Sequence, residues 1–356
     1  MKQVPLKPRP LITKRGIIAF VSISLAAAWI LLSMSSSPET WQNLHHIKVV
    51  PLLLLVAAVI AMWWLDLLRL RILTWGANSD FSTWFGFQLV WVNLLVCAVT
   101  PFESGGGPAQ IMMMTKKGIP VGKGMAITSI RSTITLILLS CTTLLVLNFW
   151  PQMMPHWPLR RLFLGISFPI LLSILILAGG LFFPERLKSW GKKVTSFLQR
   201  YRFIKPAWTE RWKEFLFNIV DDLSDTCRGY IREGKRHLIG ATLITILFLC
   251  AHFSIAPLIF WSLGAHISFL RTILIQVVLT LMIYFIPTPG SSGAAEGGFF
   301  LLFSPLIPGP ILGISVLLWR FFTVYLGVLL GAFSITHITP FWTKLTAPEK
   351  IVSGRS

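Results

Sequence analysis

Long apolar runs separated by short polar stretches dominate the chain. Six of these runs approach the roughly 20 residues that a helix needs to cross the hydrocarbon core of a bilayer. They cover residues 16–34, 49–65, 125–147, 162–183, 238–263 and 311–335. The pattern therefore predicts an all-α integral membrane protein with about six transmembrane helices.

Two further apolar stretches, 85–99 and 272–286, are too short to be ordinary spans. Each runs directly into a segment rich in proline and glycine, residues that interrupt a helix. We expect re-entrant broken-helix hairpins over 85–115 and 272–303, each returning to the side from which it entered. The alternative is that both segments cross completely, which gives eight full spans.

The composition fits this interpretation. Hydrophobic residues make up 54% of the 356 residues and charged residues only 13%. So few charges cannot cover the surface of a water-soluble protein of this length. The first apolar run is longer than the core of a secretory signal peptide and lacks a clear cleavage site, so we expect it to be retained as a span.

The placement of basic residues predicts the topology. Of the 32 Lys and Arg residues, 26 lie in the N-terminal stretch, in the segments 66–84, 116–123 and 184–237, and in the tail. Because cytoplasmic loops carry an excess of Lys and Arg, both termini are expected inside, N-in and C-in. The first hairpin would then enter from the cytoplasm and the second from outside. Eight spans would instead place 116–123 outside.

The predicted organisation has five parts. They are a cytoplasmic basic N-terminus (1–15), a first membrane half (16–183), a cytoplasmic loop (184–237), a second membrane half (238–336) and a cytoplasmic tail (337–356). The loop is basic and rich in aromatic residues, and its apolar residues recur at helical spacing, which predicts amphipathic interfacial helices. It either anchors the protein to the membrane surface or gathers anionic lipid. Nucleic acid is not expected as a partner.

The two broken segments resemble each other. The first reads TPFESGGGP and the second TPGSSGAAEGG. Each contains one carboxylate, Glu103 or Glu296, and is followed by a span with one arginine, Arg131 or Arg320. This order predicts an internal repeat, which is inverted if the two hairpins enter from opposite faces, as in many transporters.

Such breaks are suited to an anion near the middle of the membrane. Non-helical backbone at that depth must line a cavity or be buried in protein, and glycine allows close approach of a ligand to the backbone. The start of a half-helix adds free N–H groups. The predicted lipid or ion pathway consists of Glu103, Gly105, Gly106, Gly107, Arg131, Gly290, Gly293, Glu296 and Arg320. Supporting roles are assigned to Pro101, Asn93, Gln110, Pro289, Ser292 and His252.

The four charges in these segments allow two interpretations. A charged side chain at the centre of a membrane helix costs about 2.5–3.5 kcal/mol unless it is paired or hydrated. Glu103, Arg131, Glu296 and Arg320 could form two structural Glu/Arg pairs that hold the breaks against neighbouring spans. Alternatively, the arginines neutralise a lipid phosphate while a glutamate competes for them or takes up a proton.

Other polar residues in the apolar runs receive weaker interpretations. Asn93 and Gln110 are expected to hydrogen-bond the loose backbone of the first break. His252 is either a proton relay or bonded to a neighbouring helix, and Asp66 with Arg69 is expected to form an ion pair at the membrane boundary.

At these residues the chain resembles the transmembrane region of lysylphosphatidylglycerol synthases, a broad flippase-like family. The likeness rests on the first break with Gly118 and Arg131, on the PGxxGxxE motif that starts at Pro289, and on Arg320, and it covers about residues 10–340. Bifunctional members carry a C-terminal aminoacyltransferase domain, whereas only a short segment follows the last span here. The resemblance therefore implies lipid handling without aminoacyl transfer.

The favoured function is translocation of an anionic, phospho- or isoprenoid-linked lipid across the bacterial cytoplasmic (inner) membrane. No Walker motif, metal site or cofactor site is expected, nor an enzymatic activity. Partners would be the lipid itself and either a second copy or lipid-synthesis enzymes. One alternative is an accessory or scaffold protein without transport. Another is an intramembrane hydrolase, because GSSG around Ser292 resembles a serine-protease motif, although only His337 follows it.

Overall fold

The computed structural model describes residues 14–35, 48–150, 171–172, 225–230, 232, 234–265 and 267–337. Within these ranges the regular elements are helices. Most of the predicted span 162–183 and of the loop 184–237 lies outside the described residues, as do nearly all of the two predicted terminal segments.

Within the described ranges, four helical segments are long and apolar enough to cross a membrane. They are α3 (Val49–Gly76), α6 (Val121–Phe149), the pair α10 (Lys235–Phe253) and α11 (Ile255–Ser262), and the run of α14 (Gly309–Arg320), a π-helical turn η4 (Phe321–Tyr325) and α15 (Leu326–His337). These segments correspond to four predicted spans, and α1 (Lys14–Ser35) covers a fifth. The chain is therefore a multi-pass, all-helical protein over the described ranges.

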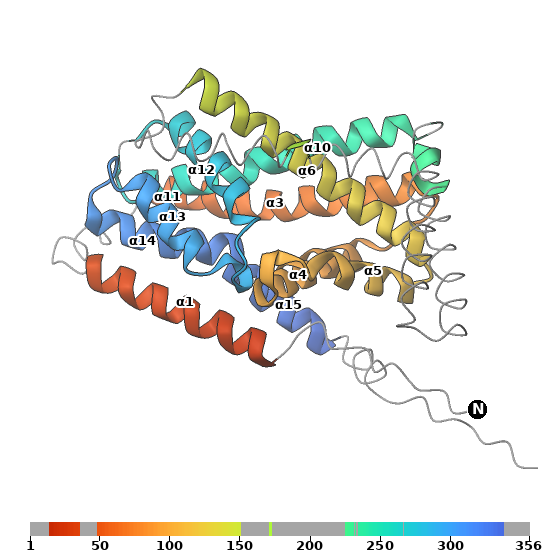
Figure 1. The fold of residues 1–356 in the computed structure, drawn as a ribbon, viewed down its shortest axis with the longest axis horizontal. Helices are drawn as coiled ribbons and strands as arrows, with labels where there is room; N and C mark the ends of the chain where they lie inside the picture. Colours follow the sequence, from red (N-terminus) through yellow and green to blue (C-terminus); the bar gives the residue numbers. More distant parts are fainter. Residues whose placement is uncertain are drawn as a thin grey trace, which may run out of the picture.

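The long helices lie along the long axis of the molecule (Figure 1). At one end of α3, the backbone N–H of Lys48 donates to the carbonyl of Ser262, at the end of α11 (3.0 Å). At the other end, the hydroxyl of Tyr230, which precedes α10, donates to the carbonyl of Leu73. The α10–α11 pair therefore packs antiparallel to α3.

Two pairs of short helices occupy the positions of the predicted hairpins. The first pair is α4 (Thr83–Val99) and α5 (Gly106–Lys116), between the end of α3 and the start of α6. The second is α12 (Phe269–Ile283) and α13 (Ala294–Phe303), between the end of α11 and the start of α14. Because α3 and α11 end at opposite ends of the bundle, the two pairs extend from opposite ends toward its middle (Figure 1).

The interruptions of the two pairs meet each other. The turn η1 (Pro101–Glu103) contacts the turn η3 (Pro289–Ser291), and η3 also contacts α4. The surrounding helices pack in a reciprocal way, since α4 lies against α15 while α12 lies against α6. The point of contact between the breaks is therefore enclosed by helices from both halves.

Both breaks adopt the same backbone conformation after their Thr-Pro sequence. Phe102 and Glu103 have φ angles of 55° and 52°, and Gly290 and Ser291 have φ angles of 57° and 53°. Three of these four are not glycine, although the left-handed region is costly for residues with a Cβ atom. The shared conformation makes Glu103 equivalent to Ser291. The sequence pattern, in contrast, suggested equivalence of Glu103 with Glu296.

Each hairpin is held by an apolar core of its own. In the first half, Leu67, Leu70 and Leu73 of α3 pack with Leu89 of α4 and Met113 of α5. In the second half, aromatic rings connect three elements: they belong to Phe260 of α11, Phe299 and Phe303 of α13, and Trp319 of α14. Burial of these side chains stabilises the four short helices of the hairpins. None of these helices is long enough to span a membrane alone.

Candidate functional site

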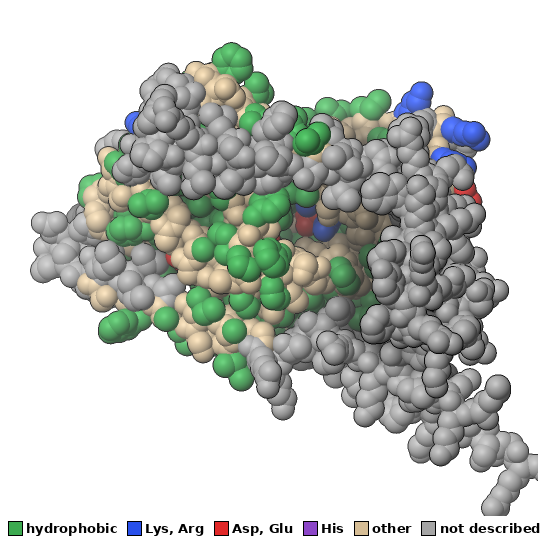
Figure 2. Space-filling model, in the orientation of Figure 1, with side chains coloured by type: hydrophobic (Ala, Val, Ile, Leu, Met, Phe, Trp, Pro, Cys, Tyr) green, Lys and Arg blue, Asp and Glu red, His purple; other side chains and the backbone are tan. Residues whose placement is uncertain are grey.

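A cavity of about 420 Å³ lies where the two breaks meet. Side chains from both halves line it, and the charged ones among the described residues are Asp66, Arg69, Glu103, Arg131 and Arg320. Figure 2 shows red and blue atoms in a hollow near the middle of one face, next to green hydrophobic side chains. Three arginines thus converge on one cavity inside an apolar protein.

The first group of charges is the Asp66 cluster, formed by Asp66, Arg69, Arg131 and Thr135. Asp66 and Arg69 lie one turn apart on α3, so their side chains share a face and Arg69 Nε donates to Asp66 Oδ1 (2.6 Å). Arg131 of α6 donates from Nη1 to the same oxygen (3.0 Å). Two guanidiniums therefore share one carboxylate.

Further contacts fix the orientation of Arg69. Its Nη1 donates to Thr135 Oγ1 (2.9 Å), and its guanidinium carbon lies 4.0 Å from the centre of the Phe248 ring. Cation–π contact and charge-assisted hydrogen bonds are both strengthened away from water. The Asp66 cluster is consequently a rigid group with one positive charge in excess.

This cluster corrects two interpretations of the sequence. The Asp66–Arg69 pair forms, but it is buried within α3 and not at the end of a span, because α3 continues from residue 65 to Gly76. Arg131 pairs with Asp66, so the suggested structural pair of Glu103 with Arg131 is wrong. The signal in the sequence was the apolar pattern beyond residue 65, which continues around the two charges.

The second group is the Arg320 cluster, formed by Arg320, Glu296, Gly290 and Ser292. Arg320 Nε donates to Glu296 Oε1 (2.8 Å), so the second suggested Glu/Arg pair exists. Arg320 Nη2 donates to the carbonyl of Gly290 (2.8 Å) and to Ser292 Oγ (3.5 Å). The other carboxylate oxygen of Glu296 accepts from the N–H of Gly293 at the start of α13 (2.7 Å). This cluster fastens the second break to α14.

The helix changes its winding directly after Arg320. Residues Phe321–Tyr325 form a π-helical turn, and Thr323 within it lines the cavity. Single π turns inside α-helices occur frequently at functional sites because they redirect side chains. Here the turn separates α14, which carries Arg320, from α15, which packs on α4.

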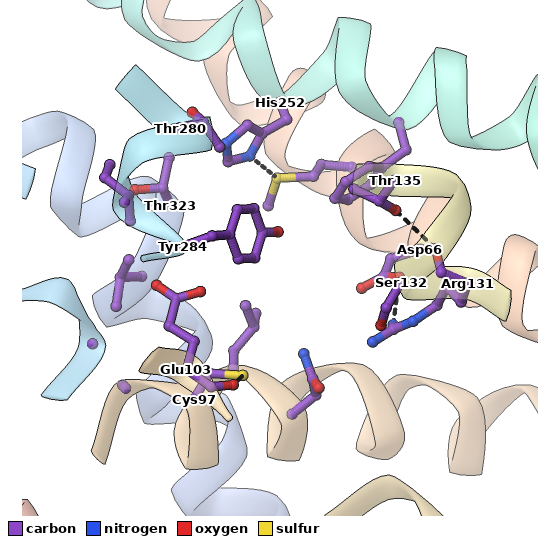
Figure 3. A pocket seen from close by; sticks show the side chains of 18 of the residues that line it. Asp66, Cys97, Glu103, Arg131, Ser132, Thr135, His252, Thr280, Tyr284 and Thr323 are labelled. Carbon is purple, nitrogen blue, oxygen red and sulfur yellow. Dashed lines mark hydrogen bonds and ion pairs between the residues drawn. The ribbon is translucent and has the colours of Figure 1, made fainter. Parts of the chain in front are cut away.

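Glu103 differs from the other carboxylates of the site. It lines the cavity, and Ser291 Oγ lies 3.5 Å from its Oε1, while the shorter hydrogen bond of that hydroxyl goes to the carbonyl of Ile283 (2.9 Å). Among the described residues no cation lies within ion-pair distance of it. Figure 3 shows its carboxylate directed into the cavity on the side opposite Asp66 and Arg131, next to Tyr284.

The three consecutive glycines of the first break have different roles. A Cβ atom on Gly105 would collide with Thr100 and Val96, and one on Gly106 would collide with Asn93 and Cys97. Both glycines therefore allow the start of α5 to approach α4. A Cβ atom on Gly107 would meet open space, and this residue lines the cavity.

In the second break, Gly290 needs its lack of a side chain for two reasons. Its φ angle is 57°, and a Cβ atom would lie 2.8 Å from the carbonyl oxygen of Ala98. It is thus the point at which the second break touches the end of α4. Gly293 also has a positive φ, 84°, and precedes α13.

The supporting residues occupy mixed positions. Asn93 lines the cavity. Gln110 is buried and donates to the carbonyl of Leu89 within α4 (3.1 Å), so it joins the two helices of the hairpin and not the loose backbone of the break. His252 lines the cavity, with Nδ1 3.4 Å from the sulfur of Met62. Its expected bond to a neighbouring helix therefore exists.

Prolines 101 and 289 start the two equivalent turns, as the Thr-Pro sequences suggest. Ser292 is buried, accepts from Arg320, and lies 3.2 Å from Ser24 Oγ of α1. Its partners are thus an arginine and a second hydroxyl. Neither of these would act as a general base for a serine nucleophile.

The sequence did not reveal several cavity residues. Tyr284 and Trp319 line the cavity, and the indole N–H of Trp319 is buried without a hydrogen-bond partner among the described residues. For Asp66 and Arg69 the sequence predicts an ion pair at the membrane boundary but not their position in the cavity. Five of the six apolar runs contain aromatic residues, so residue type alone could not distinguish Tyr284 and Trp319 from lipid-facing or core aromatics.

Comparison with known proteins places nearly the whole chain in one group. Residues 17–331 match the family described as the lysylphosphatidylglycerol synthase TM region. A protein of Archaeoglobus fulgidus described as a UPF0104 membrane protein is 22% identical over 317 residues, which cover 89% of this chain and 95% of the relative. The match spans both breaks and both charge clusters.

Proposed function

Since this chain belongs to the lysylphosphatidylglycerol synthase transmembrane-region family, we propose that it is a lipid transporter that moves an anionic lipid across the cytoplasmic membrane. The observation that carries the proposal is the Asp66 cluster, in which Arg69 and Arg131 share one carboxylate and face a cavity. One guanidinium charge there has no countercharge of its own. A phosphate or similar anion would supply it.

The position of the cavity favours a lipid over a water-soluble anion. On the face shown in Figure 2, hydrophobic side chains of the kind that contact acyl chains lie beside the hollow. A headgroup can enter such an opening sideways while its acyl chains stay in the bilayer. The left-handed residues of both breaks fit this role, since strained backbone persists mainly at functional sites.

The proposal includes a topology. Both hairpins re-enter the membrane, the first from the cytoplasm and the second from outside, so that the two breaks meet near the bilayer midplane as in inverted-repeat transporters. The contact of η1 with η3 and the opposed starts of the hairpins support this arrangement. The membrane would be the bacterial inner membrane, with both termini in the cytoplasm.

The test is transport of a labelled lipid by purified protein in proteoliposomes. Arg131→Gln removes the excess charge but leaves the Asp66–Arg69 pair in place. We expect movement of fluorescent phosphatidylglycerol to fall about tenfold or more, because a hydrogen bond to a charged group contributes about 1.5–3 kcal/mol. Mass spectrometry of lipids that copurify with the protein would identify the natural headgroup.

Arg71→Gln is the matched control. Arg71 lies on the same helix, pairs with Asp80 (3.5 Å) and is partly exposed outside the cavity. We expect normal transport in this variant. Equal transport by the parent and Arg131→Gln would contradict the assigned site. No transport by the correctly folded parent, together with copurifying lipid-synthesis enzymes, would favour an accessory role instead.

A further inference from the structure

Among the charged residues that line the cavity, Glu103 is the one that forms no ion pair with another described residue. Its carboxylate faces the cavity, receives one long hydrogen bond from Ser291, and belongs to the turn where the two breaks touch. Arg320, which lines the same cavity, is already engaged by Glu296 at 2.8 Å. Holding this carboxylate ionised in an apolar protein is therefore costly.

The balance of charges shows what the cavity lacks. Its two clusters and Glu103 contain three carboxylates and three guanidiniums, so the site is neutral when all are ionised. The Asp66 cluster carries one excess positive charge, and Glu103 carries one negative charge on the opposite side. An anionic headgroup that entered this site would leave it with a net negative charge and would lie close to the Glu103 carboxylate.

We infer that Glu103 is a proton-binding site and that one proton binds there whenever a singly charged anionic headgroup enters the cavity. This inference rests on the proposed lipid transport. Protonation cancels the negative charge of Glu103, so the headgroup meets only the excess charge of the Asp66 cluster. When the headgroup leaves on the other side, the carboxyl group releases its proton to water there. Lipid and proton then cross together, and no net charge moves.

Other titratable groups line the same cavity as Glu103. Tyr284 follows α12, Cys97 lies on α4, and His252 extends from α10 into the same cavity. The thiol of Cys97 donates to the carbonyl of Glu103 (3.1 Å), and His252 contacts the sulfur of Met62. The two clusters supply the remaining charges. Among the described carboxylates of the cavity and its two clusters, Glu103 is the one without an ion pair. Protonating it therefore breaks no ion pair, whereas protonating Asp66 or Glu296 would break one.

The first experiment uses the wild-type chain in proteoliposomes that contain fluorescent phosphatidylglycerol and a trapped pH indicator. We expect inward lipid transport to acidify the interior of the vesicles and outward transport to make it more alkaline. One proton should move with each lipid. Because the combined movement is electroneutral, a potassium diffusion potential should not change the rate. Above the pH at which Glu103 loses its proton, the rate should fall about tenfold per pH unit.

The second experiment compares two carboxylate-to-amide variants. Glu103→Gln mimics the protonated state, so its lipid transport should no longer depend on pH and should move no protons. Asp80→Asn removes a carboxylate that is more than half exposed and pairs with Arg71 outside the cavity. Its pH profile and proton movement should match those of the wild type. Glu103→Asp keeps a titratable group and should keep the coupling.

Three results would overturn the inference while leaving lipid transport intact. The first is lipid transport by the wild type without proton movement. The second is a pH dependence that persists in Glu103→Gln, which would point to His252. The third is faster, pH-independent transport of phosphatidylethanolamine that Glu103→Gln abolishes. The last would mean that the carboxylate pairs with a headgroup ammonium. Failure of the proposed function is distinct, because no lipid would then move in the wild type at any pH.

Discussion

At the scale of single residues, the buried charges of the described ranges all belong to the two clusters at the cavity. Arg69, Arg131 and Arg320 are all buried, and each donates to a carboxylate at 3.0 Å or less. Such pairs are costly to bury and more costly to break, because the remaining partner is left as an isolated charge in an apolar interior. Their arrangement should therefore affect stability as well as function.

The Glu296–Arg320 pair provides a direct stability prediction. Glu296→Gln keeps the size of the side chain but leaves Arg320 without a countercharge. We expect a loss of about 3–5 kcal/mol in the free energy of unfolding, measured as a lowered thermal midpoint in detergent. Asp80→Asn is the control, since Asp80 is mostly exposed and its pair should contribute about 0–1 kcal/mol. Equal midpoints for the two variants would show that the buried pair does not hold the second break.

At the scale of elements, close packing between helices positions the hairpins. Gly327 and Gly331 on α15 lie one turn apart in a GxxxG pattern and face α4. A Cβ atom on Gly331 would collide with the backbone of Trp91, and one on Gly327 would collide with Leu94. Small residues at this spacing let helix backbones approach closely in membranes. The α4 helix of the first hairpin is thus held by the last helix of the second half.

This contact can be tested by filling it. Gly331→Ala should push α15 from α4 and destabilise the protein by about 1–3 kcal/mol, as expected for overpacking, and thermal unfolding in detergent measures the effect. Gly240→Ala is the matched control on α10, because its Cβ atom would lie at an ordinary 3.6 Å from Ile72. That variant should be neutral or slightly stabilised by better helix propensity. The reverse order of midpoints would refute the packing argument.

At the scale of the whole molecule, the two halves contain the same backbone turn but place different side chains on it. The breaks repeat a Thr-Pro turn with two left-handed residues, and the equivalent positions hold Glu103 in one half and Ser291 in the other. A hydrogen bond joins these two side chains at the interface between the halves. The repeat therefore supplies a common scaffold, while the unlike side chains give the cavity its chemistry.

The proposed topology predicts which side of the membrane reaches each hairpin. In a background without native cysteines, Lys117→Cys between α5 and α6 should react with an impermeant thiol reagent only from the cytoplasmic side. Ser304→Cys, after α13, should react only from outside. Both side chains are exposed in the structure. Labelling of Lys117→Cys from outside would instead support eight full spans.

The sequence by itself determined where the apolar helices lie and where the two hairpins break. Apolar runs, prolines and glycines act locally, so the four long helical segments, α1 and both short pairs lie where the hydropathy pattern predicted them. The family likeness followed from the same motifs.

Only the tertiary structure decided which charges meet. Asp66 and Arg131 are 65 residues apart, and their contact depends on the rotation and register of α3 against α6. The same packing leaves Glu103 without an ion pair among the described residues, although Arg131 follows it at a spacing like that between Glu296 and Arg320. Pairing inside a bundle is set by three-dimensional distance, which a one-dimensional pattern of charges does not contain.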